Sequence, residues 1–261
     1  MTMRPHFGCD VLFASIDVFR ICNAPCSIVG YNSWQLLRIC NPLISKPALA
    51  LPTLITEAAI FANTESTHDE PALFGVTDGK AVGTYLEHKF VAHLMEKYSF
   101  AGGNSASGID IPSINVDIKV TSIKQPQSSC PFKTARQKIW GLGYHLIVFV
   151  YEKHDEPVKK TGRLDVRHTI FVSKERTADY QMSRGLRDIL EKSGNEDDLT
   201  AFMQDKNLPV DDIEAANIAK QLLIEKPEQG YLTISNALQW RLQYGRAIEQ
   251  AGTIDGLTRI I

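Results

Sequence analysis

A run of mainly apolar residues, HLIVFVY at 145–151, constrains the fold of this chain more than any other feature. The run lacks the polar–apolar alternation of a strand with one wet face, and such continuous apolar strands are buried on both faces. Burial of both faces requires further layers of structure on each side of the strand. The segment therefore predicts a layered fold in which a sheet is covered by other elements.

The neighbouring segments supply the elements that such a fold needs. Apolar side chains recur along residues 82–98 at the spacing of one helix face, and residues 115–121 alternate strictly between polar and apolar types, as in a half-buried strand. Further helices are predicted over 133–142, 177–192, 211–225 and 235–250, a further strand over 168–173, and only helices after Gly194. The predicted fold class is α/β (α+β), with a helical C-terminal part.

The 261 residues are expected to form three parts. Residues 1–70 hold four of the five cysteines and few charges, and they are interpreted as a loosely packed N-terminal extension that ends in a linker at 62–71. Residues 71–194 are expected to be the core, and residues 195–261 a helical C-terminal subdomain.

Composition argues against several classes of protein. Lys+Arg 28 against Asp+Glu 30 gives a formal charge of −2, so the whole chain shows no basic excess typical of nucleic-acid binding. The odd number of cysteines, without CxxC pairs, argues against a disulfide framework or a zinc site. The apolar stretches at 11–21 and 47–61 are short and interrupted by charges, so no membrane span and a cytoplasmic location are expected.

The segment GIDIPSINVDIKVT at 108–121 contains the candidate site. Asp117 and Lys119 are two residues apart, so in a strand they lie on one face, and the apolar alternation predicts that this face points outward. A hairpin turning at 113–114 would place Asp110 directly across from Asp117, with Cβ atoms roughly 4.5–5.5 Å apart. Two such carboxylates repel each other unless a cation lies between them, and Mg²⁺ takes carboxylate oxygens. Lys119 could orient or deprotonate an attacking water.

The same residues allow a plainer interpretation, in which Asp110 is a turn residue and Asp117 forms a surface ion pair with Lys119. The following sequence favours the site. Between Ile118 and Tyr151 there is no acidic residue, while five cations occur: Lys119, Lys124, Lys133, Arg136 and Lys138. A basic tract beside an acidic metal site fits an enzyme that acts on a polyanion such as DNA.

On these residues, the segment at 108–121 resembles the active-site hairpin of the PD-(D/E)xK nuclease superfamily, which contains most type II restriction endonucleases. In that superfamily a preceding helix often contributes a glutamate, and GTYLEHKF at 83–90 places Glu87 in the matching position. The order of helix, hairpin, basic helix and buried strand over residues 80–151 also agrees. The motif's proline is absent before Asp110, where Ile109 stands.

The resemblance implies a restriction-endonuclease-like mixed sheet and a Mg²⁺-dependent endonuclease that cuts double-stranded DNA. It implies Asp110, Asp117, Lys119 and Glu87 as catalytic residues, with Mg²⁺ on the two aspartates. The expected DNA contacts are Lys124, Gln125, Lys133, Arg136, Gln137 and Lys138.

Two further patterns have open interpretations. On the predicted helix at 235–250, a polar stripe is either a reader of bases in the major groove or a solvated face, with the loop at 125–129 as the other place where bases would be read. The stripe comprises Asn236, Gln239, Gln243, Arg246 and Gln250. His145 is expected to be a core or edge histidine rather than a catalyst.

The expected function is that of a type II restriction endonuclease that cuts at a short specific site. Cutting both strands of a symmetric site with one centre per chain calls for a two-fold homodimer. The alternatives are a DNA repair or structure-selective nuclease of the same superfamily, a non-catalytic DNA-binding protein on a nuclease-like fold, and a structural domain whose hairpin charges face solvent.

Overall fold

The computed structural model describes residues 46–103, 108–235 and 241–261. Residues Ser45–Ile261 form a compact unit of their own. Most of the predicted N-terminal extension, and residues Asn236 and Gln239 of the polar stripe, lie outside the described residues.

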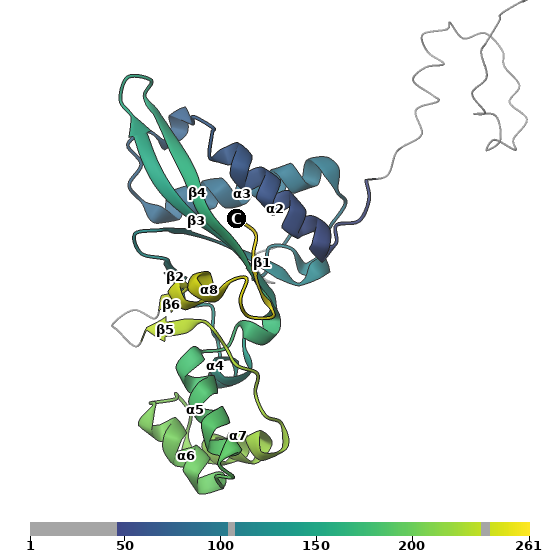
Figure 1. Cartoon of the computed structure of the whole chain (residues 1–261), viewed down its shortest axis with the longest axis vertical. Coiled ribbons are helices and arrows are strands. Elements are labelled where there is room, and N and C mark those ends of the chain that lie inside the picture. Colours follow the sequence, from purple (N-terminus) through teal and green to yellow (C-terminus); the bar gives the residue numbers. More distant parts are fainter. Residues whose placement is uncertain (1–45, 104–107, 236–240) are drawn as a thin grey trace, which may run out of the picture. The chain divides into compact units, whose positions relative to one another are not determined.

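A four-stranded mixed sheet forms the centre of this unit, as expected from the sequence (Figure 1). Its strand order is β1-β3-β4-β7, with β1 parallel to β3 and the other pairs antiparallel. The strands are β1 (Val116–Ser122), β3 (His145–Glu156), β4 (Thr161–Val172) and β7 (Leu257–Arg259). The polar–apolar strand and the continuous apolar run are therefore direct neighbours.

Both faces of β3 are buried, which confirms the interpretation of its apolar run. On one face, Ile147 and Phe149 pack in a core cluster with two helices, α2 (Leu51–Glu65) and α3 (Gly79–Lys97). On the other face, Leu146 and Val148 pack in a second cluster with the small sheet described below and with α8 (Gly245–Gln250). All four side chains are fully buried.

Helix α3 follows the predicted pattern closely. Its N-cap residue Asp78 accepts hydrogen bonds from the amides of Lys80 and Ala81, which satisfies two of the free donors at a helix start. Its buried side chains are Val82, Leu86, Phe90 and Leu94. The Phe90 ring meets Phe149 of β3 edge to face, at 5.0 Å between centroids.

A second, three-stranded antiparallel sheet has the order β2-β6-β5. Its strands are β2 (Gln127–Ser129), β6 (Arg241–Gln243) and β5 (Thr233–Ser235). The predicted helix at 235–250 is therefore wrong for Arg241–Gln243, where Leu242 and Tyr244 are buried at a spacing of two residues, and right for Gly245–Gln250. The prediction of helices alone after Gly194 is likewise wrong.

Four helices form a third core cluster: α4 (Ala135–Trp140), α5 (Tyr180–Glu191), α6 (Glu196–Asp205) and α7 (Asp212–Ile224). Ile139 of α4 and Leu186 of α5 share this cluster with Leu199 of α6 and Ile218 of α7. Helices on both sides of residue 194 thus share one core. The domain boundary expected at residue 194 therefore lies within one continuous apolar core.

Helix α2 corrects the expectation for the end of the N-terminal extension. Leu54, Ala58 and Phe61 of α2 are buried in the first core cluster, and the helix continues to Glu65. The expected loose packing is therefore wrong for residues 51–65, and the linker expected at 62–71 is helical over its first four residues. A short helical turn, η1 (Pro71–Leu73), follows.

In the part of the chain that the structure describes, no helix combines the length and the apolar character needed to cross a membrane.

Candidate active site

A tight hairpin brings Asp110 and Asp117 together, as predicted. Ile111 and Val116 form an antiparallel bridge, closed by hydrogen bonds of 2.9 and 3.2 Å between their backbones. The turn is the short helix η2 (Pro112–Ile114) followed by Asn115, whose φ of 57° lies in the left-handed region that asparagine tolerates. Because Ile111 pairs with Val116, Asp110 falls opposite Asp117.

The aspartates are held by different donors. Asp110 Oδ2 accepts a hydrogen bond from the backbone amide of Ile118 at 2.7 Å. Asp117 Oδ2 lies 2.6 Å from Lys119 Nζ, and the Asp117 side chain is only 4% exposed. The expectation that Asp117 points outward is therefore wrong, because Asp117 pairs with Leu146 of β3, on the face of the main sheet that packs in the second core cluster.

Glu87 of α3 joins this cluster, as its position in the sequence suggested. Burial raises the pKa of Glu87, and the negative charge of Asp110, to which Glu87 is hydrogen-bonded, raises it further. Burial and contact with Asp110 raise the pKa of Asp117 to about 7, although Lys119 opposes this shift. Three carboxyl groups are thus crowded beside one ammonium group.

The donor set fits a hard divalent cation in its chemistry. Carboxylate oxygens are the ligands that such ions take, and a cation would relieve the repulsion that raises the pKa of Glu87 and Asp117. Asp110 and Asp117 are the residues that would hold it, with Glu87 hydrogen-bonded to Asp110 beside them. Within the described ranges no three acidic, histidine or cysteine side chains converge as a ready-made metal cage. The aspartate oxygens are turned instead towards Lys119 Nζ and the Ile118 amide.

A cleft of about 570 Å³ opens beside the cluster. Glu87 and Lys119 line it, and the start of α3 contributes Asp78 and Lys80. Further lining residues come from the segment from β1 to β2 and from β6: Thr121, Ser122, Gln125, Gln127, Ser128, Ser129 and Arg241. Glu87 and Lys119 are therefore accessible from a polar cleft, whereas Asp110 and Asp117 lie behind them and do not line it.

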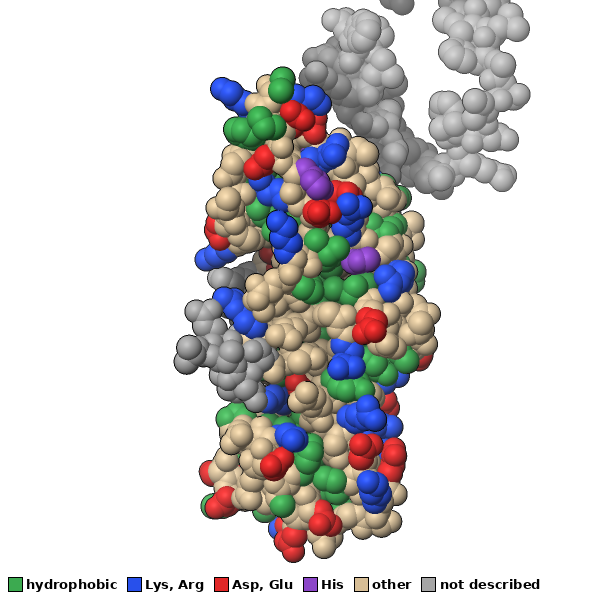
Figure 2. All heavy atoms as spheres, turned by 60° about the vertical axis from the view of Figure 1, so that its left-hand side comes forward, with side chains coloured by type: hydrophobic (Ala, Val, Ile, Leu, Met, Phe, Trp, Pro, Cys, Tyr) green, Lys and Arg blue, Asp and Glu red, His purple; other side chains and the backbone are tan. Residues whose placement is uncertain are grey.

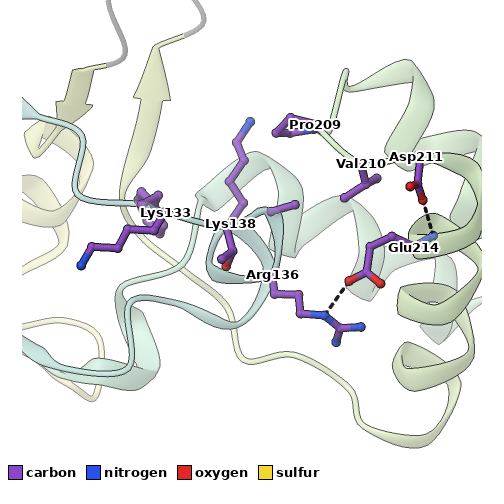
Figure 3. A pocket seen from close by; sticks show the side chains of 10 residues that line it. Lys133, Arg136, Lys138, Pro209, Val210, Asp211 and Glu214 are labelled. Atoms are coloured by element: carbon purple, nitrogen blue, oxygen red, sulfur yellow. Dashed lines mark hydrogen bonds and ion pairs between the residues drawn. The ribbon is translucent and has the colours of Figure 1, made fainter.

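The six expected DNA contacts occupy two kinds of environment. Lys124, Gln125 and Lys133 are exposed. Gln137 belongs to the capping box that starts α4, and Lys138 is 6% exposed. Arg136 Nε donates to Glu214 Oε1 at 2.8 Å, across a pocket of about 710 Å³ between α4 and the start of α7 (Figure 3).

Surface charge is mixed on the face that Figure 2 draws, where basic and acidic side chains are interspersed. Lys133 is nevertheless close to the hairpin, since a Cβ added at Gly108 would lie 3.9 Å from Lys133 Nζ. Local cations beside the carboxylate cluster, rather than a strongly basic surface, are therefore available to a polyanion.

Two other residues have structural contacts. His145 Nδ1 accepts the Lys174 amide at 3.0 Å, and its ring stacks on Phe171, in agreement with the expectation of a structural histidine. The helical stripe is not formed, because Gln243 lies in β6. The guanidinium of Arg246 in α8 lies 3.7 Å from the ring centroid of Tyr180.

Thr121 was not singled out from the sequence, although it continues the alternation of Asp117 and Lys119. Its hydroxyl accepts the Gln127 amide at 2.9 Å and donates to the Gln127 carbonyl at 3.0 Å. The strand that carries Asp117 and Lys119 is thereby tied to the small sheet.

A mixed sheet flanked by helices, with a carboxylate and lysine cluster at the hairpin entering β1, fits the restriction-endonuclease-like fold class. Residues 48–259 match the family model of the type II restriction enzyme NspV. The type II restriction enzyme NspV of Nostoc sp. (strain ATCC 29411 / PCC 7524) is 64% identical over 212 residues, which cover 81% of this chain and 96% of that protein. No solved structure was found to match. The chain belongs to the NspV family of type II restriction enzymes.

Proposed function

We propose that this chain is a Mg²⁺-dependent type II restriction endonuclease that hydrolyses phosphodiester bonds of double-stranded DNA at a short specific site. Membership of the family supports the activity class. The observation that carries the assignment of the centre is the gathering of Glu87, Asp110 and Asp117 beside Lys119, with Glu87 and Lys119 lining an open cleft.

In this proposal Asp110 and Asp117 bind the ion and Glu87 supports it through Asp110. When bound, a divalent cation stabilises negative charge on the phosphate oxygens and makes a coordinated water more acidic. Lys119 Nζ donates a hydrogen bond to the attacking water or to a non-bridging phosphate oxygen, which orients the water and stabilises the charge of the transition state. The new bond joins the water oxygen to phosphorus, and the bond from phosphorus to the leaving sugar oxygen breaks.

The DNA backbone is proposed to lie over the exposed residues Lys124, Gln125 and Lys133, with Arg136, Gln137 and Lys138 as further candidates. Phosphate contacts of this kind set the affinity and position of a duplex but do not read its sequence. A homodimer is proposed because one centre per chain must serve two strands, and sedimentation of the protein with and without DNA measures this directly.

Plasmid digestion with and without Mg²⁺ tests the proposed function. A restriction enzyme gives discrete fragments in Mg²⁺ and none when the metal is chelated. A smear of fragments would show that the protein is a nonspecific nuclease and does not cut at a specific site. Absence of cutting by a folded protein would overturn the proposal and favour a DNA-binding protein on a nuclease-like fold.

A further inference from the structure

The small sheet presents one apolar and one polar face. Leu242 and Ile234 point into the second core cluster, and the Ser128 hydroxyl lies 2.6 Å from the hydroxyl of fully buried Tyr244. Since side chains alternate along strands, the residues between these belong to the opposite face. The polar face contains Gln127, Ser129, Arg241, Gln243 and Thr233.

Strand register aligns these polar residues in rows. Gln127 of β2 pairs with Gln243 of β6, which pairs in turn with Thr233 of β5. Ser129 pairs with Arg241 in the next row. The described residues of the polar face therefore group two amides, two hydroxyls and one guanidinium.

This face continues from the candidate active site. Gln127, Ser129 and Arg241 line the same cleft as Glu87 and Lys119. A duplex whose scissile phosphate reaches Lys119 would thus pass directly beside the polar face.

The connection to the catalytic strand is also direct. Thr121 lies four residues after Asp117 in β1. Its hydroxyl makes two hydrogen bonds to the backbone of Gln127. A third backbone contact joins Tyr244, next to Gln243, to the Pro126 carbonyl at 2.9 Å. The position of the polar face relative to Lys119 is therefore fixed by short, specific bonds.

We propose that the polar face of β2-β6-β5 reads base edges in the major groove, with Gln127, Gln243 and Arg241 as specificity-determining residues. The major groove admits β-strands, and Gln pairs bidentately with adenine and Arg with guanine. Neutral amides suit base readout better than phosphate binding, which favours cations. The inference rests on the proposed function, because it assumes that duplex DNA enters the cleft.

The test is enrichment from a randomised duplex pool, with bound duplexes sequenced in Ca²⁺ and cleavage measured separately in Mg²⁺. Wild type enriches one sequence. Gln243→Ala and Arg241→Ala each lose preference at particular base positions by about tenfold or more, and keep binding to random duplexes. Gln181→Ala on α5 and Arg163→Ala on β4, both exposed and outside the cleft, are the matched controls and leave the enriched sequence unchanged.

The outcomes separate the two proposals. If Gln243→Ala and Arg241→Ala enrich the wild-type sequence with unchanged preference, or if wild type enriches none, the reading role is overturned. If wild type enriches a sequence but cuts nothing in Mg²⁺, the proposed function fails while the reading role stands.

Thr121 is inferred to be a positioning residue that acts through Gln127. Thr121→Val keeps the shape of the side chain but removes the hydroxyl, whereas Thr121→Ser keeps the hydroxyl. We expect Thr121→Val to weaken base preference in the same pool assay and Thr121→Ser to restore it. Equal behaviour of the two variants would contradict a role for the hydroxyl.

Discussion

Asp117 has an environment unlike that of an ordinary strand aspartate. It is buried at 3% exposure, and burial together with Asp110 raises its pKa to about 7. Lys119 forms an ion pair with this buried carboxyl group. At the scale of residues, the roles proposed for the two side chains therefore differ: the aspartate is a ligand, and the lysine acts on water and on phosphate charge.

This division of roles predicts the behaviour of Lys119→Ala. Cleavage should fall by about 10²–10³-fold, because a donor to the transition-state charge is lost. Mg²⁺ affinity, measured by calorimetry, should stay close to that of wild type, since the amine does not hold the ion. A collapse of Mg²⁺ affinity in Lys119→Ala, with the exposed control Lys192→Ala unaffected, would contradict the assignment.

At the scale of elements, hydrogen bonds to one buried carboxylate connect α2 to α3 and to Tyr98 at its end. Glu57 of α2 accepts hydrogen bonds from Tyr98 at 2.8 Å and Lys97 at 2.7 Å, and its other contact is His93 Nε2 at 2.7 Å. Burial alone would raise the pKa of Glu57, but these bonds outweigh it and lower the pKa to about 2. The charged form of Glu57 therefore stabilises the packing that places Glu87.

The lowered pKa of Glu57 predicts a pH dependence of stability. Because the folded-state pKa lies below the ordinary value of 4.5, the contribution is complete above pH 4.5 and is lost as pH falls towards 2. It amounts to about 2–3 kcal/mol at most. Urea unfolding at pH 7 and pH 3.5 should show a smaller drop for Glu57→Gln than for wild type. An equal drop would refute this role, and Glu96→Gln, exposed on α3, is the control.

The elements that the sequence predicts well are those whose apolar residues fit only one kind of secondary structure. The run at 145–151 and the helix face of Val82, Leu86, Phe90 and Leu94 both appear as expected. The predicted helix at 235–250 is wrong at Arg241–Gln243 because the apolar residues at 234, 238, 242 and 248 also suit a helix, while the structure pairs Leu242 with Ser128 and Ile234 across strands. Such pairing depends on β2, more than a hundred residues earlier, and no local pattern contains it.

The candidate active site also has one part that the sequence predicts and one part that it does not. The hairpin of Asp110 and Asp117 is local, so turn geometry and alternation predict it. The burial of Asp117 arises on the face of the main sheet that packs in the second core cluster, and the bonds of Thr121 to Gln127 tie β1 to the small sheet. The sequence around β1 indicates neither of these contacts. The resemblance to a family supplied Glu87, which spacing alone would not single out.

At the scale of the whole molecule, the folded unit begins before α2, which predicts the outcome of two truncations. Removal of residues 1–44 should leave a folded, active protein, because Ser45–Ile261 is a compact unit. Removal of residues 1–63 deletes the buried Leu54, Ala58 and Phe61, and the large apolar residues are each worth about 2–5 kcal/mol, so the chain should unfold. Circular dichroism and plasmid cleavage measure both. A folded, active chain starting at Thr64 would contradict the place of α2 in the core.

The exposed cations predict the salt dependence of DNA binding by the whole molecule. Replacing Lys124 or Lys133 with Ala should weaken binding to all duplexes alike and reduce the magnitude of the salt slope by about 1. Lys220→Ala, an exposed lysine on α7, is the control and should leave the slope unchanged. Anisotropy titrations of a random duplex over several salt concentrations measure the slopes. Unchanged salt slopes for both variants would show that the DNA backbone does not contact Lys124 or Lys133.

The most direct test of the central claim is the cleavage rate of Asp117→Ala on plasmid DNA in Mg²⁺, measured beside wild type after both proteins are shown to be folded. We expect discrete fragments from wild type and a rate lower by more than about a thousandfold in the variant, because a metal ligand is lost, while duplex binding persists. Cleavage by Asp117→Ala within tenfold of wild type would show that the cluster of Glu87, Asp110, Asp117 and Lys119 is not the active site.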